Sequence, residues 1–254
     1  MSKDRRKYFD QLAATSRKYY VPWLSSYMRI CGGINVLEIG CGEGGNLLPF
    51  AQAGCRVLGV DMAEGKIQAA ERFFAEEGAE GSFMASDIFA VKALEGQFDL
   101  IICHDVIEHI QDKEEFMRRV RLYLRPQGLA FFAFPAWQMP FGGHQQNCRN
   151  KMLSHLPYFH LLPKGMYRWI LNRGGESPEA VKELLEIKRT ATSIELFERI
   201  IREGGFRKVD RRLWLINPHY EAKFGLRPRR LLRLPASIPW LRNFYTTSCF
   251  YLLQ

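Results

Sequence analysis

Acidic residues follow strand-like segments at several points in the first half of the chain. The run VLEIGCGEGG carries Glu38 on a short apolar stretch that breaks at Gly40 and Gly42. A strand that passes through glycines into a helix lets the backbone approach a ligand without an intervening side chain. The next predicted strand, 56–60, ends at Asp61, about twenty residues after the first glycine, where a ribose-binding acid is expected. This spacing predicts a site for an adenosine-containing small molecule.

The glycines leave two cofactor classes open. Together with Gly45 they satisfy the G-x-G-x-x-G pattern of dinucleotide sites, so an NAD(P)-dependent oxidoreductase is one alternative. Glu38 argues against it, because an acid there can hold a cationic amino group and would repel a pyrophosphate. Asp87 ends the following strand and precedes Ile88, a pair that suits the amine edge and the ring face of an adenine. These features favour S-adenosylmethionine.

With these motifs the chain resembles the class I S-adenosylmethionine-dependent methyltransferases. Within that class it is similar to the ubiquinone-biosynthesis O-methyltransferase-like branch (methyltransferase type 11/23). The likeness covers residues 34–135 and resumes weakly over 193–217. The matching segments are Glu38-x-Gly40-x-Gly42-x-Gly44, Asp61-Met62, Asp87-Ile88, Asp105-Val106-Ile107-Glu108-His109 and Arg125-Pro126-x-Gly128. As a set these motifs are specific for the family, but none of them identifies the methyl acceptor.

The resemblance implies a role for each matched position. Glu38 would hold the amine of the methionine moiety, Asp61 would bind both ribose hydroxyls, and Asp87 would bind the adenine. His104 and Asp105 would lie beside the methionine moiety. The cofactor-binding positions are therefore Glu38, Gly40, Cys41, Gly42, Asp61, Met62, Asp87, Ile88, His104 and Asp105. Methyl transfer would leave S-adenosylhomocysteine as the product.

A neutral hydroxyl is a poor nucleophile, so an oxygen acceptor needs a base or a metal ion. We expect His109 and His144 to be the catalytic residues. In the resembled quinone and small-RNA 2′-O-methyltransferases an E-x-x-E-H segment binds a divalent ion, and here it reads Asp105-x-x-Glu108-His109, with His144 as a fourth candidate ligand. A divalent metal is thus possible but not favoured, because many relatives carry the Glu–His pair without one.

The acceptor class is suggested by a long apolar segment. Residues 136–192 interrupt the strand–helix pattern and are rich in aromatic residues. Soluble loops are seldom so apolar unless they pack or bind something, and a small-molecule, lipid-like or glycan-like acceptor would fit. Packing of the segment on itself explains the same residues about as well. Gly142 and Gly143, just before His144, would bring the backbone close to this site.

The composition describes a basic protein with ordinary apolar content. The net charge is +9 over 254 residues, and no apolar run approaches the length of a spanning helix. Six scattered cysteines without a C-x-x-C pair indicate reduced thiols, so we expect a cytoplasmic protein. Basic residues concentrate after residue 206. They could meet an anionic membrane surface or RNA, and an RNA methyltransferase is therefore a second alternative; a plain solvated face is favoured over either.

The alternation of strands and helices predicts an α/β protein with a Rossmann-like class I methyltransferase fold. We expect a mostly parallel seven-stranded sheet with an antiparallel last strand and helices on both faces. Strands are expected at 35–39, 56–60, 81–86, 98–103, 129–134, 209–216 and 245–253, and helices at 4–30 (divided by Pro22), 46–53, 64–77, 113–124 and 193–203. Residues 1–254 would form one domain: N-terminal helices 1–34, a cofactor-binding core 35–135, a substrate-side insertion 136–192 and a C-terminal part 193–254 with a basic insertion 217–243.

Overall fold

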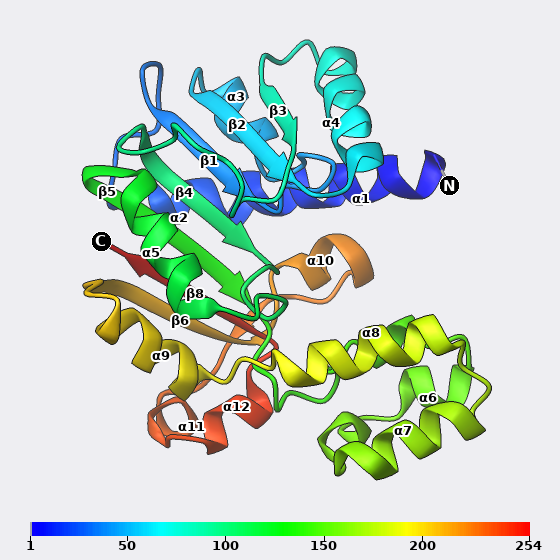
Figure 1. Cartoon of the computed structure of the whole chain (residues 1–254). Helices are drawn as coiled ribbons and strands as arrows, with labels where there is room; N and C mark the ends of the chain where they lie inside the picture. The colour runs from blue at the N-terminus through cyan, green and yellow to red at the C-terminus, as the bar shows by residue number, and fades with distance from the viewer. Residues whose placement is uncertain (1) are drawn as a thin grey trace.

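A computed structural model describes residues 2–254, and its centre is one mixed β-sheet. The strands follow the order β3-β2-β1-β4-β5-β8-β6-β7 across the sheet (Figure 1). Their bounds are β1 Asn35–Ile39, β2 Arg56–Asp61, β3 Ser82–Ala85, β4 Phe98–His104, β5 Leu124–Phe134, β6 Lys208–Ile216, β7 Arg229–Arg230 and β8 Ser248–Leu253. The seven predicted strands all form, and the two-residue β7 adds an eighth at one edge.

The first five strands in the sheet order are parallel, and β8 is antiparallel to both of its neighbours. The predicted fold class, with an antiparallel last strand, is therefore confirmed. The central strand β4 and the last strand β8 are buried almost throughout, because helices cover the sheet on both faces. β6 runs parallel to β5 through this arrangement, so its carboxyl end reaches the same edge as that of β4.

Two hydrophobic layers cover the sheet. One face packs against α5 and α9, and the other packs against α1, α2, α3 and α4. The helices that form these layers are α1 Ser2–Thr15, α2 Val21–Leu24, α3 Leu48–Gln52, α4 Glu64–Glu76, α5 Lys113–Tyr123 and α9 Ile194–Glu203. Ser193 caps α9 as expected, since its side chain accepts from the N–H of Leu196.

The N-terminal helical segment is more continuous and shorter than predicted. A π-helical turn over Ser16–Tyr20 joins α1 to α2, and Pro22 follows this turn at the start of α2 without ending the helix. The helix ends at Leu24 instead of residue 30. The helix expected over 46–53 is likewise reduced to α3, because the residues before Leu48 form tight turns that follow the glycines.

The first insertion forms a small lobe beside the carboxyl edge of the sheet (Figure 1). Its regular elements are α6 Lys151–His155, α7 Lys164–Arg173 and α8 Pro178–Arg189, with short 3-10 turns at Gln145–Asn147 and Phe159–Leu161. A separate hydrophobic cluster that includes Phe159, Tyr167 and Leu184 holds the lobe together. Much of the aromatic content of this segment therefore packs on itself.

The second insertion carries α10 His219–Phe224, β7, α11 Arg233–Ser237 and α12 Leu241–Tyr245. The buried guanidinium of Arg242 anchors it to α9 through ion pairs to Glu195 at 2.9 Å and Glu198 at 2.7 Å. Within residues 2–254 there is no helix with both the length and the hydrophobicity that a membrane crossing requires.

Candidate active site

Glu38 lies on β1 one residue before its carboxyl end and is buried with 1% exposure. Its Oε1 accepts a hydrogen bond from Asn46 Nδ2 at 2.8 Å, whereas Oε2 has no partner within residues 2–254. Burial raises the pKa of this carboxyl to about 8, with a smaller contribution from Asp61, against the opposing hydrogen bond from Asn46. A buried acid with one unused oxygen is suited to receive a cationic group from a ligand.

Asp61 holds the glycine turn in place. Its Oδ2 accepts from the N–H of Gly42 at 2.9 Å, and its Oδ1 accepts from the N–H of Ala63 at 2.9 Å. Gly40 has a φ of +73°, and a Cβ there would lie 2.4 Å from Val106 Cγ2, so the position requires glycine. The turn after β1 and the end of β2 are thereby joined into one rigid rim.

The remaining cofactor candidates differ in exposure. The carboxylate of Asp87 is exposed and accepts from the N–H of Phe89 at 2.9 Å, whereas Ile88 is buried in the hydrophobic core. Met62 is 76% exposed, so it is open to a ligand. Cys41 is buried behind the turn, where burial raises the pKa of its thiol, and only its backbone can face a ligand.

The end of β4 places two predicted residues side by side. His104 is buried, and its ring centroid lies 5.8 Å from that of Tyr20. Asp105 follows with a positive φ of +53°, a conformation that turns the chain sharply at the strand end, and its N–H donates to Ala133 O at 2.8 Å. Asp105 is exposed, so it faces the space in front of the sheet edge.

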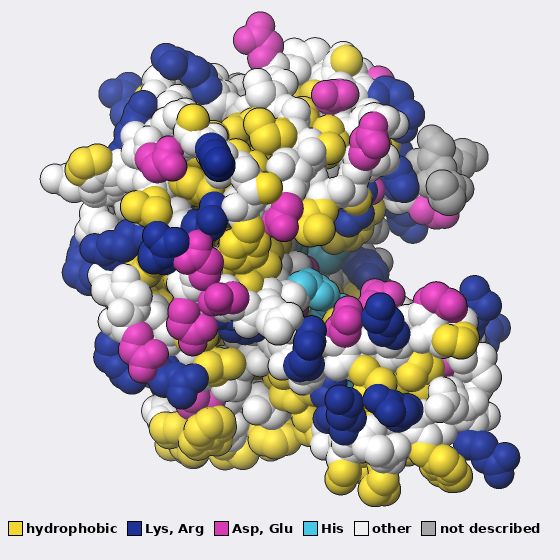
Figure 2. All heavy atoms as spheres, viewed as in Figure 1, with side chains coloured by type: hydrophobic (Ala, Val, Ile, Leu, Met, Phe, Trp, Pro, Cys, Tyr) yellow, Lys and Arg dark blue, Asp and Glu magenta, His cyan; other side chains and the backbone are white. Residues whose placement is uncertain are grey.

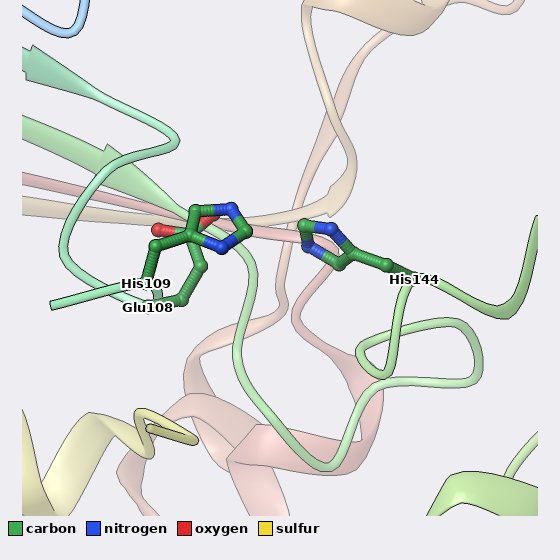
Figure 3. Close-up of side chains that lie close together, drawn as sticks. All are labelled: Glu108, His109 and His144. Carbon is green, nitrogen blue, oxygen red and sulfur yellow. The ribbon is translucent and has the colours of Figure 1, made fainter. Parts of the chain in front are cut away.

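Three predicted residues, Glu108, His109 and His144, meet although two distant segments supply them. One ligand atom from each lies within 4.8 Å of the others, and the two imidazole rings are 5.0 Å apart, centroid to centroid. Figure 3 shows the rings facing one another across the gap between the segment after β4 and the first insertion. Asp105, the first acid of the predicted ligand set, is not a member of this group.

The three side chains differ in exposure: Glu108 is buried, His144 is half-buried and His109 is exposed. Burial raises the pKa of Glu108 well above its ordinary value, with help from Asp105, and neither of its carboxyl oxygens has a partner within residues 2–254. Although part of His109 reaches solvent, its position among protein atoms lowers its pKa to about 4, and His144 adds to this effect. Burial also lowers the pKa of His144. Both imidazoles are therefore neutral near pH 7.

A cleft of about 520 Å³ opens in front of this edge, between the sheet core and the two insertions. Figure 2 shows histidine side chains in the hollow beside the first insertion. Polar groups of the lining include Asp105, His144, His155 and His219, and apolar groups include Met139, Phe141, Phe224 and Leu226. One strand-end acid, Asp105, thus lies at the wall of a partly apolar chamber.

His219 is a site residue that the sequence analysis did not select. It is 7% exposed and lines the cleft, its Nδ1 lies 3.3 Å from Thr15 Oγ1, and its Nε2 has no partner within residues 2–254. Burial, and secondarily His104, lowers its pKa to about 4. The available signal was its position two residues after Asn217, directly beyond the carboxyl end of β6.

The glycines before His144 have a different role from the one expected. A Cβ at Gly142 would lie 2.2 Å from Trp137 O, and one at Gly143 would lie 2.3 Å from His160 Cβ. The two glycines therefore allow the first insertion to pack on itself. Their effect on the site is indirect: they hold His144, which has a φ of +55°, at the wall of the cleft.

Comparisons with known proteins agree with this geometry. Residues 36–128 match the family model described as a methyltransferase domain. The magnesium protoporphyrin IX methyltransferase from Synechocystis PCC 6803, solved with bound S-adenosylhomocysteine, superposes with a TM-score of 0.56 at 15% identity, over 95% of this chain and 82% of that chain. Residues 36–128 thus carry a methyltransferase domain, and the fold around them is that of the class I S-adenosylmethionine-dependent methyltransferases.

Curated relatives that resemble this domain are ubiquinone biosynthesis O-methyltransferases. The ubiquinone biosynthesis O-methyltransferase of Ruegeria pomeroyi is 26% identical over 186 residues, or 73% of this chain and 65% of that protein. The one from Methylobacterium sp. is 36% identical over 101 residues, or 40% of this chain and 41% of that protein. The chain thus spans less than two thirds of the length of these relatives. Neither the oxidoreductase nor the RNA methyltransferase alternative finds support here.

Proposed function

We propose that this protein transfers the methyl group of S-adenosylmethionine to a hydroxyl oxygen of a small-molecule acceptor held in the cleft. The observation that carries the proposal is that Asp105, which directly follows β4 at the carboxyl edge of the parallel strands, also lines the wall of the cleft. A cofactor bound along the rim and an acceptor in the cleft would therefore meet beside Asp105. In-line transfer forms the new O–CH₃ bond as the S–CH₃ bond breaks, and it yields S-adenosylhomocysteine and a proton.

The residues at the rim fit this cofactor. The unpartnered Oε2 of Glu38 would receive the amine of the methionine moiety, and ionisation of this carboxyl would follow from the approach of the cation. Asp61 keeps lone pairs on both oxygens for the ribose hydroxyls while it holds the glycine turn. Asp87, two residues beyond the end of β3, would accept from the adenine amine with its exposed carboxylate, whereas Ile88, buried in the core, supports this segment from behind.

The cleft supports an acceptor with a polar end and an apolar body. Its polar groups gather near Asp105 and His144, whereas Met139, Phe141 and Phe224 supply apolar surface. A volume of about 520 Å³ is within the range of small-molecule sites. An aromatic or lipid-like alcohol would place its hydroxyl among the histidines and its body against these apolar side chains.

A neutral histidine takes the hydroxyl proton in this proposal. His219 presents an Nε2 lone pair that no protein group uses, and the lowered pKa keeps the ring unprotonated near pH 7. His144 lies on the opposite insertion, backed by His109, and would orient the hydroxyl. The two insertions thus supply one functional imidazole each.

The group Glu108, His109 and His144 also has the composition of a divalent-cation site. Glu108 has two unpartnered buried oxygens, and both histidines are neutral, so all three could act as ligands. A bound cation would lower the pKa of the acceptor hydroxyl.

The test begins with calorimetric titration of the purified protein with S-adenosylhomocysteine and, separately, with NADH. We expect micromolar binding of the first ligand alone. The Asp61→Ala variant should lose this binding, because it removes the ribose ligand and releases the glycine turn. NADH binding in its place, or unchanged affinity in the variant, would contradict the assignment. Methyl transfer from labelled S-adenosylmethionine to phenolic and long-chain alcohols then identifies the acceptor.

A further inference from the structure

The second insertion carries large apolar side chains into solvent. Five of them, which we call the apolar ridge, lie between the N-cap of α11 and the first residue of α12: Leu232 (74% exposed), Leu234 (75%), Ile238 (41%), Trp240 (62%) and Leu241 (41%). Neighbouring Leu231 and Ala236 instead pack against the main hydrophobic core. The segment is therefore anchored on one side and presents the ridge on the other.

The ridge is held in a defined position. The N–H of Trp240 donates to Glu195 Oε1 at 2.9 Å, and Arg242 donates to the same oxygen at 2.9 Å. Trp240 has a positive φ of +64°, which an unrestrained tryptophan would avoid. The backbone is thus fixed while the indole remains exposed.

The segment that carries the ridge is strongly basic. From residue 222 to residue 254 the sequence contains no Asp or Glu, and it contains Lys223 and five arginines. Of these arginines, only the buried Arg242 forms an ion pair within residues 2–254. The other four are all exposed, and we call them the arginine cluster: Arg227, Arg229, Arg230 and Arg233. Exposed apolar side chains and cations without an ion pair thus alternate along one short segment, from Arg227 to Leu241.

The lobe of the first insertion extends this surface. Figure 2 shows hydrophobic side chains along the lower rim, where Figure 1 places α11 and α7. On α7, Met166 is 54% exposed and Trp169 is 62% exposed, and Arg173 lies over the indole of Trp169 at 5.9 Å. Tyr158 and Phe244, with ring centroids 6.3 Å apart, connect the two parts.

We propose that the apolar ridge and the arginine cluster dock this protein on an anionic lipid membrane surface. Exposed Trp and Leu enter the boundary between headgroups and acyl chains, and nearby arginines pair with lipid phosphates. Acidic side chains, which such a surface would repel, are missing from the whole segment. A protein partner or a second copy of this chain would need acidic side chains at matching positions. An anionic membrane instead presents negative charge over its whole surface.

Flotation with vesicles tests the docking surface directly, without measuring catalysis. Vesicles of phosphatidylcholine alone are compared with phosphatidylcholine mixed with phosphatidylglycerol, at low and high salt. Wild type should float with the anionic vesicles only and should be released by salt. The Arg229→Gln/Arg230→Gln variant should bind roughly 25-fold more weakly, at about fivefold per arginine. The Leu234→Ser/Trp240→Ser variant should lose at least about tenfold.

Matched controls separate this surface from general charge and hydrophobicity. Lys92→Gln/Arg202→Gln removes two exposed cations elsewhere, and Leu122→Ser removes an exposed leucine on α5. Both should float like wild type. Failure of wild type to bind anionic vesicles at low salt, or equal loss in the controls, would overturn the proposal. So would sedimentation velocity that shows a dimer abolished by Leu234→Ser/Trp240→Ser, because the ridge would then belong to a second copy.

Discussion

Thr15 fixes the tautomer of His219, from a position 204 residues earlier in the chain. The hydroxyl of Thr15 donates its only proton to Gln11 O at 2.8 Å, so towards His219 Nδ1 it can act only as an acceptor. Nδ1 therefore carries the ring proton, and Nε2 keeps its lone pair for the cleft. A main-chain carbonyl in α1 thus determines which nitrogen of a histidine in α10 is available as a base.

Replacement of Thr15 by valine should lower kcat about tenfold while S-adenosylhomocysteine affinity stays unchanged. Valine preserves the volume but removes the acceptor for Nδ1–H, so the second tautomer becomes populated and the ring is less well oriented. Thr15→Ser should restore the rate because it keeps the hydroxyl. The dependence of kcat on pH tests whether Thr15 acts by orienting His219. The pH at which kcat falls on the acidic side should shift in Thr15→Val and should not shift in Thr15→Ser. A wild-type rate and profile in Thr15→Val would refute this role.

Glu38 makes cofactor binding dependent on pH. Its pKa of about 8 means that the carboxyl is mostly neutral at pH 7 in the unliganded protein, and it must ionise to pair with the amine. Affinity for S-adenosylhomocysteine should therefore fall about tenfold per pH unit below 8. Titrations between pH 6 and 8 measure the slope, and Glu38→Gln should bind weakly with almost no slope. A steep slope in the variant would assign the titration to another group.

The raised pKa of Glu38 has the opposite effect on the stability of the unliganded protein, which should fall as the pH rises. An acid whose folded pKa is raised contributes stability below its ordinary pKa and loses that contribution as pH rises through the folded value. Thermal melting without ligand should therefore show decreasing stability from about pH 4.5 to about pH 8 relative to Glu38→Gln. Parallel curves for the two proteins would show that Glu38 is already ionised.

Removal of His144 should lower kcat by about 100-fold and leave cofactor affinity within twofold of wild type.

Glu108, which lies close to His144, provides a separate test for a bound cation. Mn²⁺ should raise the melting temperature of wild type and have a smaller effect on Glu108→Gln, because the variant keeps the histidines but lacks the carboxylate. Equal increases in melting temperature in the two proteins would mean that the ion binds elsewhere. No increase in either protein would mean that the two histidines do not bind Mn²⁺.

Arg242 should be important for stability. Its side chain is 8% exposed and pairs with Glu195 and Glu198, so Arg242→Met leaves Glu195 without a cation and leaves Glu198 with only Lys208 and Arg211. We expect a loss of about 3 kcal/mol in the free energy of unfolding, measured with urea. Arg118→Met is the matched control: the Arg118–Glu115 pair is exposed, and its loss should cost less than about 1 kcal/mol. Equal losses would mean that the buried network contributes little.

The sequence by itself determined the sheet and the cofactor rim. Strands and helices of this core arise from local patterns, and a parallel sheet brings the carboxyl ends of its strands to one edge. Glu38, Asp61 and Asp87 could therefore be placed together from spacing alone, since each follows its strand at a readable position. The same reasoning predicted that Asp105, which directly follows β4, lies at this edge of the sheet.

Only the tertiary structure decided what stands opposite that rim. His144 meets His109, and His219 meets Thr15, through packing of insertions whose paths no local periodicity specifies. The aromatic residues of the first insertion turned out to build its own small core, whereas Leu234 and Trp240, no more apolar in sequence, stay exposed. Burial depends on which surfaces a segment finds after folding, and residue type alone does not state it.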